Sequence, residues 1–120
     1  IIADLMLKET RTKVEDGKVG YIGIGMVTIP SDYSQMYNIP IGVFVREVEE
    51  GSPAKEAGFM YGDIIVQFEG EKISTNQDVQ NILQYYRAGS TVTVTVKRFQ
   101  KGEYQEVELS VKLGERPKSN

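Results

Sequence analysis

The sequence of 120 residues contains no cysteine, no histidine and no tryptophan. Without cysteine the chain forms no disulfide and offers no thiolate to a metal ion. Without histidine it lacks both the usual general base for a serine nucleophile and the commonest zinc ligand. We therefore expect these residues to hold no catalytic site, no metal and no cofactor. A serine–lysine pair is the one enzymatic alternative left open.

Long apolar runs are also lacking, since no stretch approaches the roughly 20 residues that span a bilayer. The start, Ile1-Ile2-Ala3-Asp4, has neither the basic residues nor the apolar segment of a signal peptide. A formal net charge of −3 gives no electrostatic reason to expect nucleic acid as a partner. The length suits one compact domain, and the missing initiator Met suggests that it was cut from a longer protein.

The two ends of the chain differ in composition from its middle. Four apolar residues at helical spacing precede a polar stretch that stops at Asp16-Gly17, which predicts a linker helix over residues 1–17. Residues 114–120 are polar and include Pro117, so we expect a flexible tail. The folded domain is therefore predicted to span residues 18–113.

Turn residues and apolar periodicity divide the predicted domain into short elements. Ser31 and Ser52 stand where helix N-caps are favoured, and Asn38 and Gly58 where helices end in the left-handed region. The predicted strands are 20–27, 43–48 and 64–69 with a brief extension to 73. A hairpin is predicted at the end, with alternating residues over 91–96 and 107–113 around a turn at 100–103. The predicted helices are 32–37, capped by Ser31, 53–57, and one that begins at Thr75 and is stopped by Ala88-Gly89.

The helix that begins at Thr75 has one apolar face. Thr75 and Asp78 have the spacing of a capping box, although Glu or Gln is the better partner. The positions i, i+3, i+4 and i+7 form a continuous stripe, which consists of Val79, Ile82, Leu83 and Tyr86. Such a stripe is more often plain core than a binding surface.

Glycines at positions 20, 23 and 25 precede a short apolar run. Glycine allows backbone conformations in which successive N–H groups point into one hollow, and such a hollow binds an anion. The alternative is an ordinary strand in which glycine marks a bulge and the apolar side chains fill a core. The stretch alone supports both interpretations about equally.

Four motifs in this order resemble the PDZ domains that follow the protease domain in HtrA/Deg-type bacterial serine proteases. They are Tyr21-Ile22-Gly23-Ile24, Gly51-Ser52-Pro53-Ala54 with Ala57-Gly58, Gly62-Asp63-Ile64-Ile65, and Gly70 with Ile73. The resemblance covers about residues 18–113 and implies an α+β fold, a partly open β-barrel or sandwich of five to six strands capped by two helices. Val19 stands where that family often has arginine, and Lys18 is the nearest substitute.

The resemblance implies a groove that binds peptides by strand addition. The terminal carboxylate of the ligand is expected at Tyr21, Ile22, Gly23 and Ile24, and the rest of the groove at Gly25, Met26, Val27, Asp78, Ile82 and Tyr86. The pocket for the terminal side chain would be lined by four apolar or aromatic residues, Ile22, Ile24, Ile82 and Tyr86, so we expect ligands with an apolar C-terminal residue. Capping is at least as good an explanation of Asp78, and Val79 and Leu83 are assigned to the core.

The resemblance also implies a setting for the parent protein. It would be a serine endopeptidase outside the cytoplasmic membrane, in the periplasm or membrane-anchored, and a homotrimer or larger assembly. Partners would then be C-terminal peptides, unfolded protein segments and its own protease domain. Two alternatives are a structural or oligomerisation module that binds no peptide, and a PDZ domain of another envelope protease.

Overall fold

The structure is a computed structural model that describes residues 20–115, and its sheet has six strands. The strand order is β1-β2-β3-β5-β6, with the short β4 paired to β3, and all pairs are antiparallel. The strands are β1 Ile24–Thr28, β2 Val43–Val48, β3 Ile64–Phe68, β4 Glu71–Lys72, β5 Thr91–Gln100 and β6 Glu103–Lys112. This is the α+β, PDZ-like sheet that the resemblance implies.

The longest pairing is the hairpin of β5 and β6, and the sequence predicted it correctly. Valines alternate with threonines along β5, and Val92, Val94 and Val96 are fully buried. A strand exposes alternate residues on opposite faces, so this pattern gives the sheet one apolar face. Lys101 and Gly102 both have positive φ at the hairpin turn. The core therefore lies against the inner face of this hairpin.

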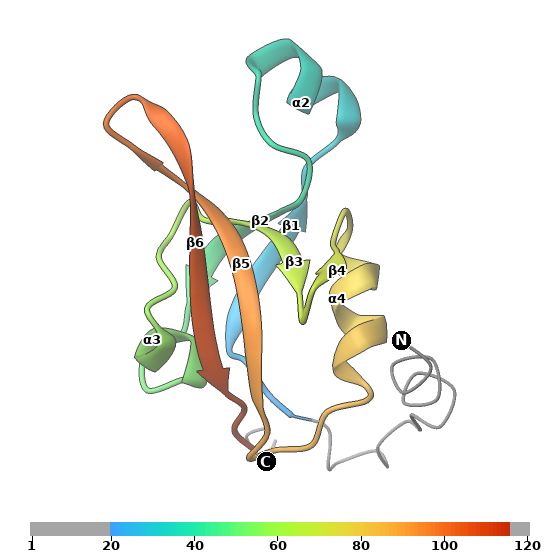
Figure 1. Cartoon of the computed structure of the whole chain (residues 1–120), viewed down its shortest axis with the longest axis vertical. Coiled ribbons are helices and arrows are strands. Elements are labelled where there is room, and N and C mark those ends of the chain that lie inside the picture. The colour runs from blue at the N-terminus through green and yellow to red at the C-terminus, as the bar shows by residue number, and fades with distance from the viewer. Residues whose placement is uncertain (1–19, 116–120) are drawn as a thin grey trace.

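Three helices, rather than the two of the predicted fold class, accompany the sheet in the described part of the chain: α2 Ser31–Tyr37, α3 Pro53–Ala57 and α4 Asn76–Leu83. In Figure 1, α3 and α4 lie at opposite flanks of the strands, and α2 projects from the same end as the β5–β6 turn. The predicted caps of α3 are confirmed, because Ser52 Oγ accepts from the Lys55 N–H and Gly58 has a φ of 101°. Asn38 ends α2 in the left-handed region, as predicted.

Three predicted boundaries were wrong. The strand predicted over 20–27 begins only at Ile24, because the preceding residues bond to other parts of the domain. Ser31 does not cap α2; Pro30 occupies the N-cap position and makes no side-chain bond. The helix predicted to reach Ala88-Gly89 ends at Leu83, and the turn that follows it is described below.

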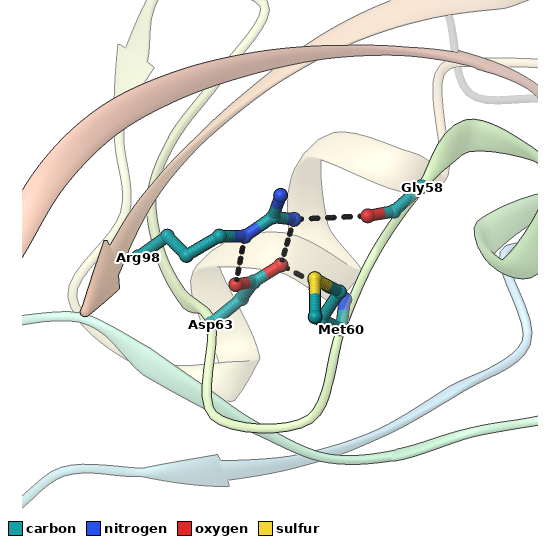
Figure 2. Close-up of polar contacts among 4 residues, drawn as sticks. All are labelled: Gly58, Met60, Asp63 and Arg98. Carbon is teal, nitrogen blue, oxygen red and sulfur yellow. Dashed lines mark hydrogen bonds and ion pairs between the residues drawn. The ribbon is translucent and has the colours of Figure 1, made fainter. Parts of the chain in front are cut away.

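An ion pair fastens β5 to the loop before β3 (Figure 2). Arg98 Nε and Nη2 each donate to one carboxylate oxygen of Asp63, both at 2.8 Å, and Nη2 also donates to the Gly58 carbonyl at 2.9 Å. The same carboxylate accepts from the Met60 N–H at 2.9 Å. Only 1% of the Asp63 side chain is exposed, so this charge depends on its partners.

The predicted linker helix over residues 1–17 lies outside the described residues, as do Lys18 and Val19 and most of the predicted tail. Gly114, predicted as the first tail residue, instead forms an antiparallel bridge with Tyr21. Among residues 20–115, no helix has the length and apolar character needed to cross a membrane.

Candidate functional site

The backbone between Tyr21 and Ile24 is held by its carbonyl groups. Three consecutive carbonyls accept hydrogen bonds from the body of the domain: Tyr21 from the Gly114 N–H (3.0 Å), Ile22 from the Ala54 N–H (2.9 Å) and Gly23 from the Glu49 N–H (3.0 Å). In a trans peptide the carbonyl and the next N–H point in opposite directions, and the described chain has no cis peptide. The N–H groups of Ile22, Gly23 and Ile24 therefore point away from the domain body.

Two of these N–H groups have no hydrogen-bond partner among the described residues. Within residues 20–115, no hydrogen bond occupies the N–H of Ile22 or of Gly23. Successive N–H groups that face one side form a concave anion site. The hollow that the glycine stretch suggested is thus consistent with the observed backbone, whereas the alternative of an ordinary strand fails for residues 20–23.

Gly23 is required by this loop for two independent reasons. Its φ is 87°, in the region that disfavours residues with a Cβ atom. A Cβ added to it would also lie 2.3 Å from the Ser52 Cβ. The loop can therefore pack onto the start of α3 only with glycine at this position.

β1 is the last strand of the sheet at this end and pairs only with β2 among the strands described. The Glu49 N–H bond to Gly23 flanks the Ile24–Val48 pair, and the Ile29 N–H bond to Gly42 (3.2 Å) flanks the Thr28–Val43 pair. Both pairs are thus of the non-hydrogen-bonded kind, in which the residue's own N–H and C=O point away from the partner strand. The register shift skips a residue of β2 and leaves the alternation of β1 intact. Ile24, Met26 and Thr28 therefore present their backbone groups at the open edge.

Helix α4 lies beside this edge and is hydrogen-bonded to it through its first residue, Asn76. The Asn76 N–H donates to Thr28 Oγ1 at 2.9 Å, and Asn76 Nδ2 donates to the Met26 carbonyl at 3.2 Å. Ile24, Met26, Ile82 and Tyr86 are partly buried and pack against the core. Val79, one turn from Ile82, is only 1% exposed, which confirms its predicted place in the core.

The turn after α4 brings Tyr86 next to the loop of residues 20–23. The N–H groups of Tyr85 and Tyr86 bond to the carbonyls three residues earlier, as in a 3₁₀ turn. The Tyr86 carbonyl accepts from the Gly20 N–H at 2.8 Å, and its ring lies 6.1 Å from that of Phe68. The predicted groove residue Tyr86 is thus next to the loop, although it is not helical.

Asp78 acts as the predicted cap. Its Oδ2 accepts from the N–H groups of Ser74 (2.8 Å) and Thr75 (3.1 Å), and the Asp78 N–H donates to Thr75 Oγ1. The bonds from the Ser74 and Thr75 N–H groups hold the pKa of the Asp78 carboxyl below its ordinary value. Its charge therefore already serves α4, and a groove role for Asp78 remains only a prediction.

Sequence reasoning missed Asn76. A polar residue directly after the N-cap Thr75 is ordinary in the first turn of a helix, so Asn76 gave no signal. Its hydrogen-bond partner, Met26, is 50 residues away in sequence. It also missed the hydrogen bond from the Tyr21 hydroxyl to Glu49 Oε2, which holds the Tyr21 side chain over the β2–α3 turn.

Residues 20–113 match the family described as "PDZ domain". The chain belongs to the PDZ domain family. This PDZ domain is similar to part of the serine protease Do-like HtrA of Bacillus subtilis, with 33% identity over 102 residues that cover 77% of the chain and 23% of that relative. It is similarly related to a probable periplasmic serine endoprotease DegP-like of Hahella chejuensis, with 28% identity covering 83% of the chain and 21% of the relative.

A third relative has a different chemistry. A putative zinc metalloprotease of Brucella suis is 52% identical over 54 residues, which cover 45% of the chain and 14% of that relative. Among solved structures, the HtrA3 PDZ domain bound to a phage-derived ligand, FGRWV, superposes with a TM-score of 0.65 and is 26% identical, with coverage of 78% of the chain and 84% of that structure.

 The HtrA-type protease AlgW in complex with a decapeptide has a TM-score of 0.71 and is 23% identical; the match covers 85% of the chain and 31% of that structure and supports the fold alone.

The PDZ domain corresponds to a small part of these relatives. It spans about a quarter or less of the length of the curated proteases that it matches. What those proteases do as whole proteins is therefore a separate question from what this domain does.

Proposed function

We propose that this PDZ domain binds the C-terminal segments of other polypeptides by strand addition to the open edge of β1. The observation that carries the proposal is the set of three anchored carbonyls, which turns the N–H groups of Ile22, Gly23 and Ile24 to one side. These groups lie where β1 begins. A strand that pairs with β1 in antiparallel fashion would therefore bring its C-terminus to this hollow.

A terminal carboxylate is the anion that fits such a hollow. It carries a full charge and two acceptor oxygens, and hydrogen bonds to a charged acceptor are shorter and stronger than neutral ones. The backbone N–H groups recognise no side chain, so this contact favours any free C-terminus. Specificity would then come from the side chains around it.

The side chains beside the hollow favour an apolar terminal residue. Ile24 and Met26 on β1 and Ile82 and Tyr86 on the other wall are only partly buried against the core, while Ile22 below them is 5% exposed. Burying a Val- or Leu-sized ligand side chain here contributes about 1.5–3 kcal/mol. We therefore expect ligands that end in Val, Leu, Ile or Phe, including segments of unfolded proteins.

The proposal extends to the parent protein through its relatives. Several of these are named periplasmic serine endoproteases. We propose that the domain regulates a serine endopeptidase outside the cytoplasmic membrane, that the parent is a homotrimer or larger, and that the domain also contacts its own protease domain. The alternative is that the parent is another envelope protease. It is supported by the 54-residue segment in which the chain is similar to a putative zinc metalloprotease.

The test is a titration with matched peptides. The pentapeptide FGRWV, taken from the ligand of the HtrA3 PDZ domain, would be compared as free acid and as C-terminal amide, together with a library varied at the last residue. We expect the free acid to bind at least about tenfold more tightly, since 1.4 kcal/mol corresponds to tenfold and bonds to a charged group contribute about 1.5–3 kcal/mol. Equal binding of acid and amide would refute carboxylate recognition.

One surface favours the second candidate function, a module that contacts neighbouring protein without binding peptides. A cleft of about 870 Å³ lies between α2 and the β5–β6 turn. Its aromatic members Tyr33, Tyr37 and Phe99 are 55%, 58% and 60% exposed. If substitution of these residues by Ser changed the sedimentation of the parent protein while no C-terminal peptide bound the domain, this second function would replace the first.

A further inference from the structure

We infer that the side chain of Asn76 competes with a ligand strand for the Met26 carbonyl. We call this side chain a latch, because it blocks the groove beyond the point where the last ligand residue pairs with Ile24. The inference rests on the proposed strand addition and adds to it a residue that sets how much of a ligand the groove pairs with. It is carried by the bond from Asn76 Nδ2 to the Met26 carbonyl (3.2 Å).

The Met26 carbonyl is the acceptor that a ligand strand needs. In an antiparallel pair, outward-facing residues alternate with a period of two. With the terminal carboxylate at the hollow, the N–H of the last ligand residue would reach the Ile24 carbonyl. The N–H of the third residue from the end would then reach the carbonyl of Met26. This is the carbonyl that Asn76 Nδ2 already uses.

The amide of Asn76 also occupies space at this edge. Its backbone N–H is fixed to Thr28 Oγ1 at 2.9 Å, so the residue is joined to β1 at two successive outward-facing positions. Its Oδ1 is buried and has no hydrogen-bond partner within the described chain. The head group therefore lies in the gap between α4 and β1 rather than in solvent.

The orphaned oxygen makes the latch a weak one. A buried acceptor without a partner is unfavourable, and rotating the side chain outward would return Oδ1 to water. The side chain therefore cannot keep its bond to Met26 and expose Oδ1 to water at the same time. An incoming peptide N–H exchanges for the N–H of Asn76 at little net gain, so wild-type affinity would come mainly from the carboxylate and the terminal side chain.

A rival explanation is that both donors share the carbonyl, since a carbonyl oxygen has two lone pairs. In that case Asn76 would leave ligand affinity unchanged or would support it. The two explanations predict opposite outcomes for Asn76→Ala. Asn81→Ala is the matched control, because Asn81 lies on the same helix, is exposed, and bonds only to Gln77 among the described residues.

The experiment measures affinity for two versions of free-acid FGRWV. One is the ordinary peptide, and the other has an ester in place of the amide N–H of arginine, the third residue from the end. We expect Asn76→Ala to bind the ordinary peptide about threefold to tenfold more tightly than wild type, the net value of one hydrogen bond. Its affinity for the ester should change less than about twofold, and Asn81→Ala should match wild type with both.

The outcomes separate the inference from the function on which it rests. Weaker or unchanged binding of the ordinary peptide by Asn76→Ala, or an equal gain for both peptides, would overturn the latch while leaving strand addition in place. Binding by Asn76→Ala alone, with none by wild type, would support the latch. If neither protein bound either peptide, the proposed function would fail and the latch with it. Thermal melts of all variants would confirm that they fold.

Discussion

Replacing Arg98 by Met tests whether the buried ion pair of Figure 2 supports the fold. Met retains much of the volume of the arginine stem but removes three hydrogen bonds, two to Asp63 and one to the Gly58 carbonyl. The Asp63 carboxylate would stay in a site where 1% of its side chain is exposed. Among the hydrogen bonds of residues 20–115, its carboxylate would keep only the one from the Met60 N–H.

The size of the effect follows from this burial. Removing one partner of a buried pair costs about 3–5 kcal/mol, and the Arg98 side chain is itself 16% exposed, so we expect about 2–4 kcal/mol. Urea denaturation at pH 7 gives the free energy of unfolding and checks that the slope m is unchanged. In a domain of this size the midpoint of thermal unfolding should fall by roughly 10–25 °C.

A surface pair in the same protein supplies the control. Lys55 Nζ lies 3.7 Å from Glu50 Oε1, with 53% and 88% of the two side chains exposed. Lys55→Met should cost less than about 0.5 kcal/mol, because exposed pairs contribute little. If Arg98→Met cost no more than Lys55→Met, the argument from burial would be refuted.

Three further predictions address the site. Gly23→Ala should abolish binding of free-acid peptides and lower the free energy of unfolding by more than about 1 kcal/mol, because φ is 87° and the Cβ would meet Ser52; unchanged titrations would contradict this. Ile82→Lys should melt near wild type but lose about 1–3 kcal/mol of binding, whereas Val79→Lys should unfold; the reverse pattern would mean that the wrong helix face was chosen. The lowered pKa of Asp78 stabilises the fold above its ordinary pKa, and this contribution is lost as the pH falls through the lowered value. Unfolding free energies of wild type and Asp78→Asn should therefore differ at pH 7 and converge in strong acid, and a constant difference would count against the cap.

Local chemical signals explain what the sequence could predict. The caps at Ser52 and Gly58 and the capping box at Thr75 and Asp78 involve residues only a few positions apart. The alternation of the β5–β6 hairpin is likewise readable residue by residue. Such features form where the sequence suggests, because few distant contacts compete with them.

Contacts between distant residues explain what it could not predict. Helix α4 ends before the Ala88-Gly89 stop signal, where Tyr86 bonds to Gly20. The bond between Asn76 and Met26 spans 50 residues, and the pair of Arg98 and Asp63 spans 35. No local pattern encodes these distances, so they emerge only once the sheet has assembled.

The bridge between Tyr21 and Gly114 places the two ends of the described region, residues 20–115, side by side. The N–H of each residue donates to the carbonyl of the other, at 2.9 and 3.0 Å. A circular permutant could therefore join residue 114 to residue 20 through a short peptide and open the chain at the exposed turn of Lys101 and Gly102. In that molecule β6 would precede the loop of residues 21–24, and the three carbonyl groups of that loop would keep their hydrogen-bond partners. The architecture thus depends on which segments meet and not on the order in which the chain visits them.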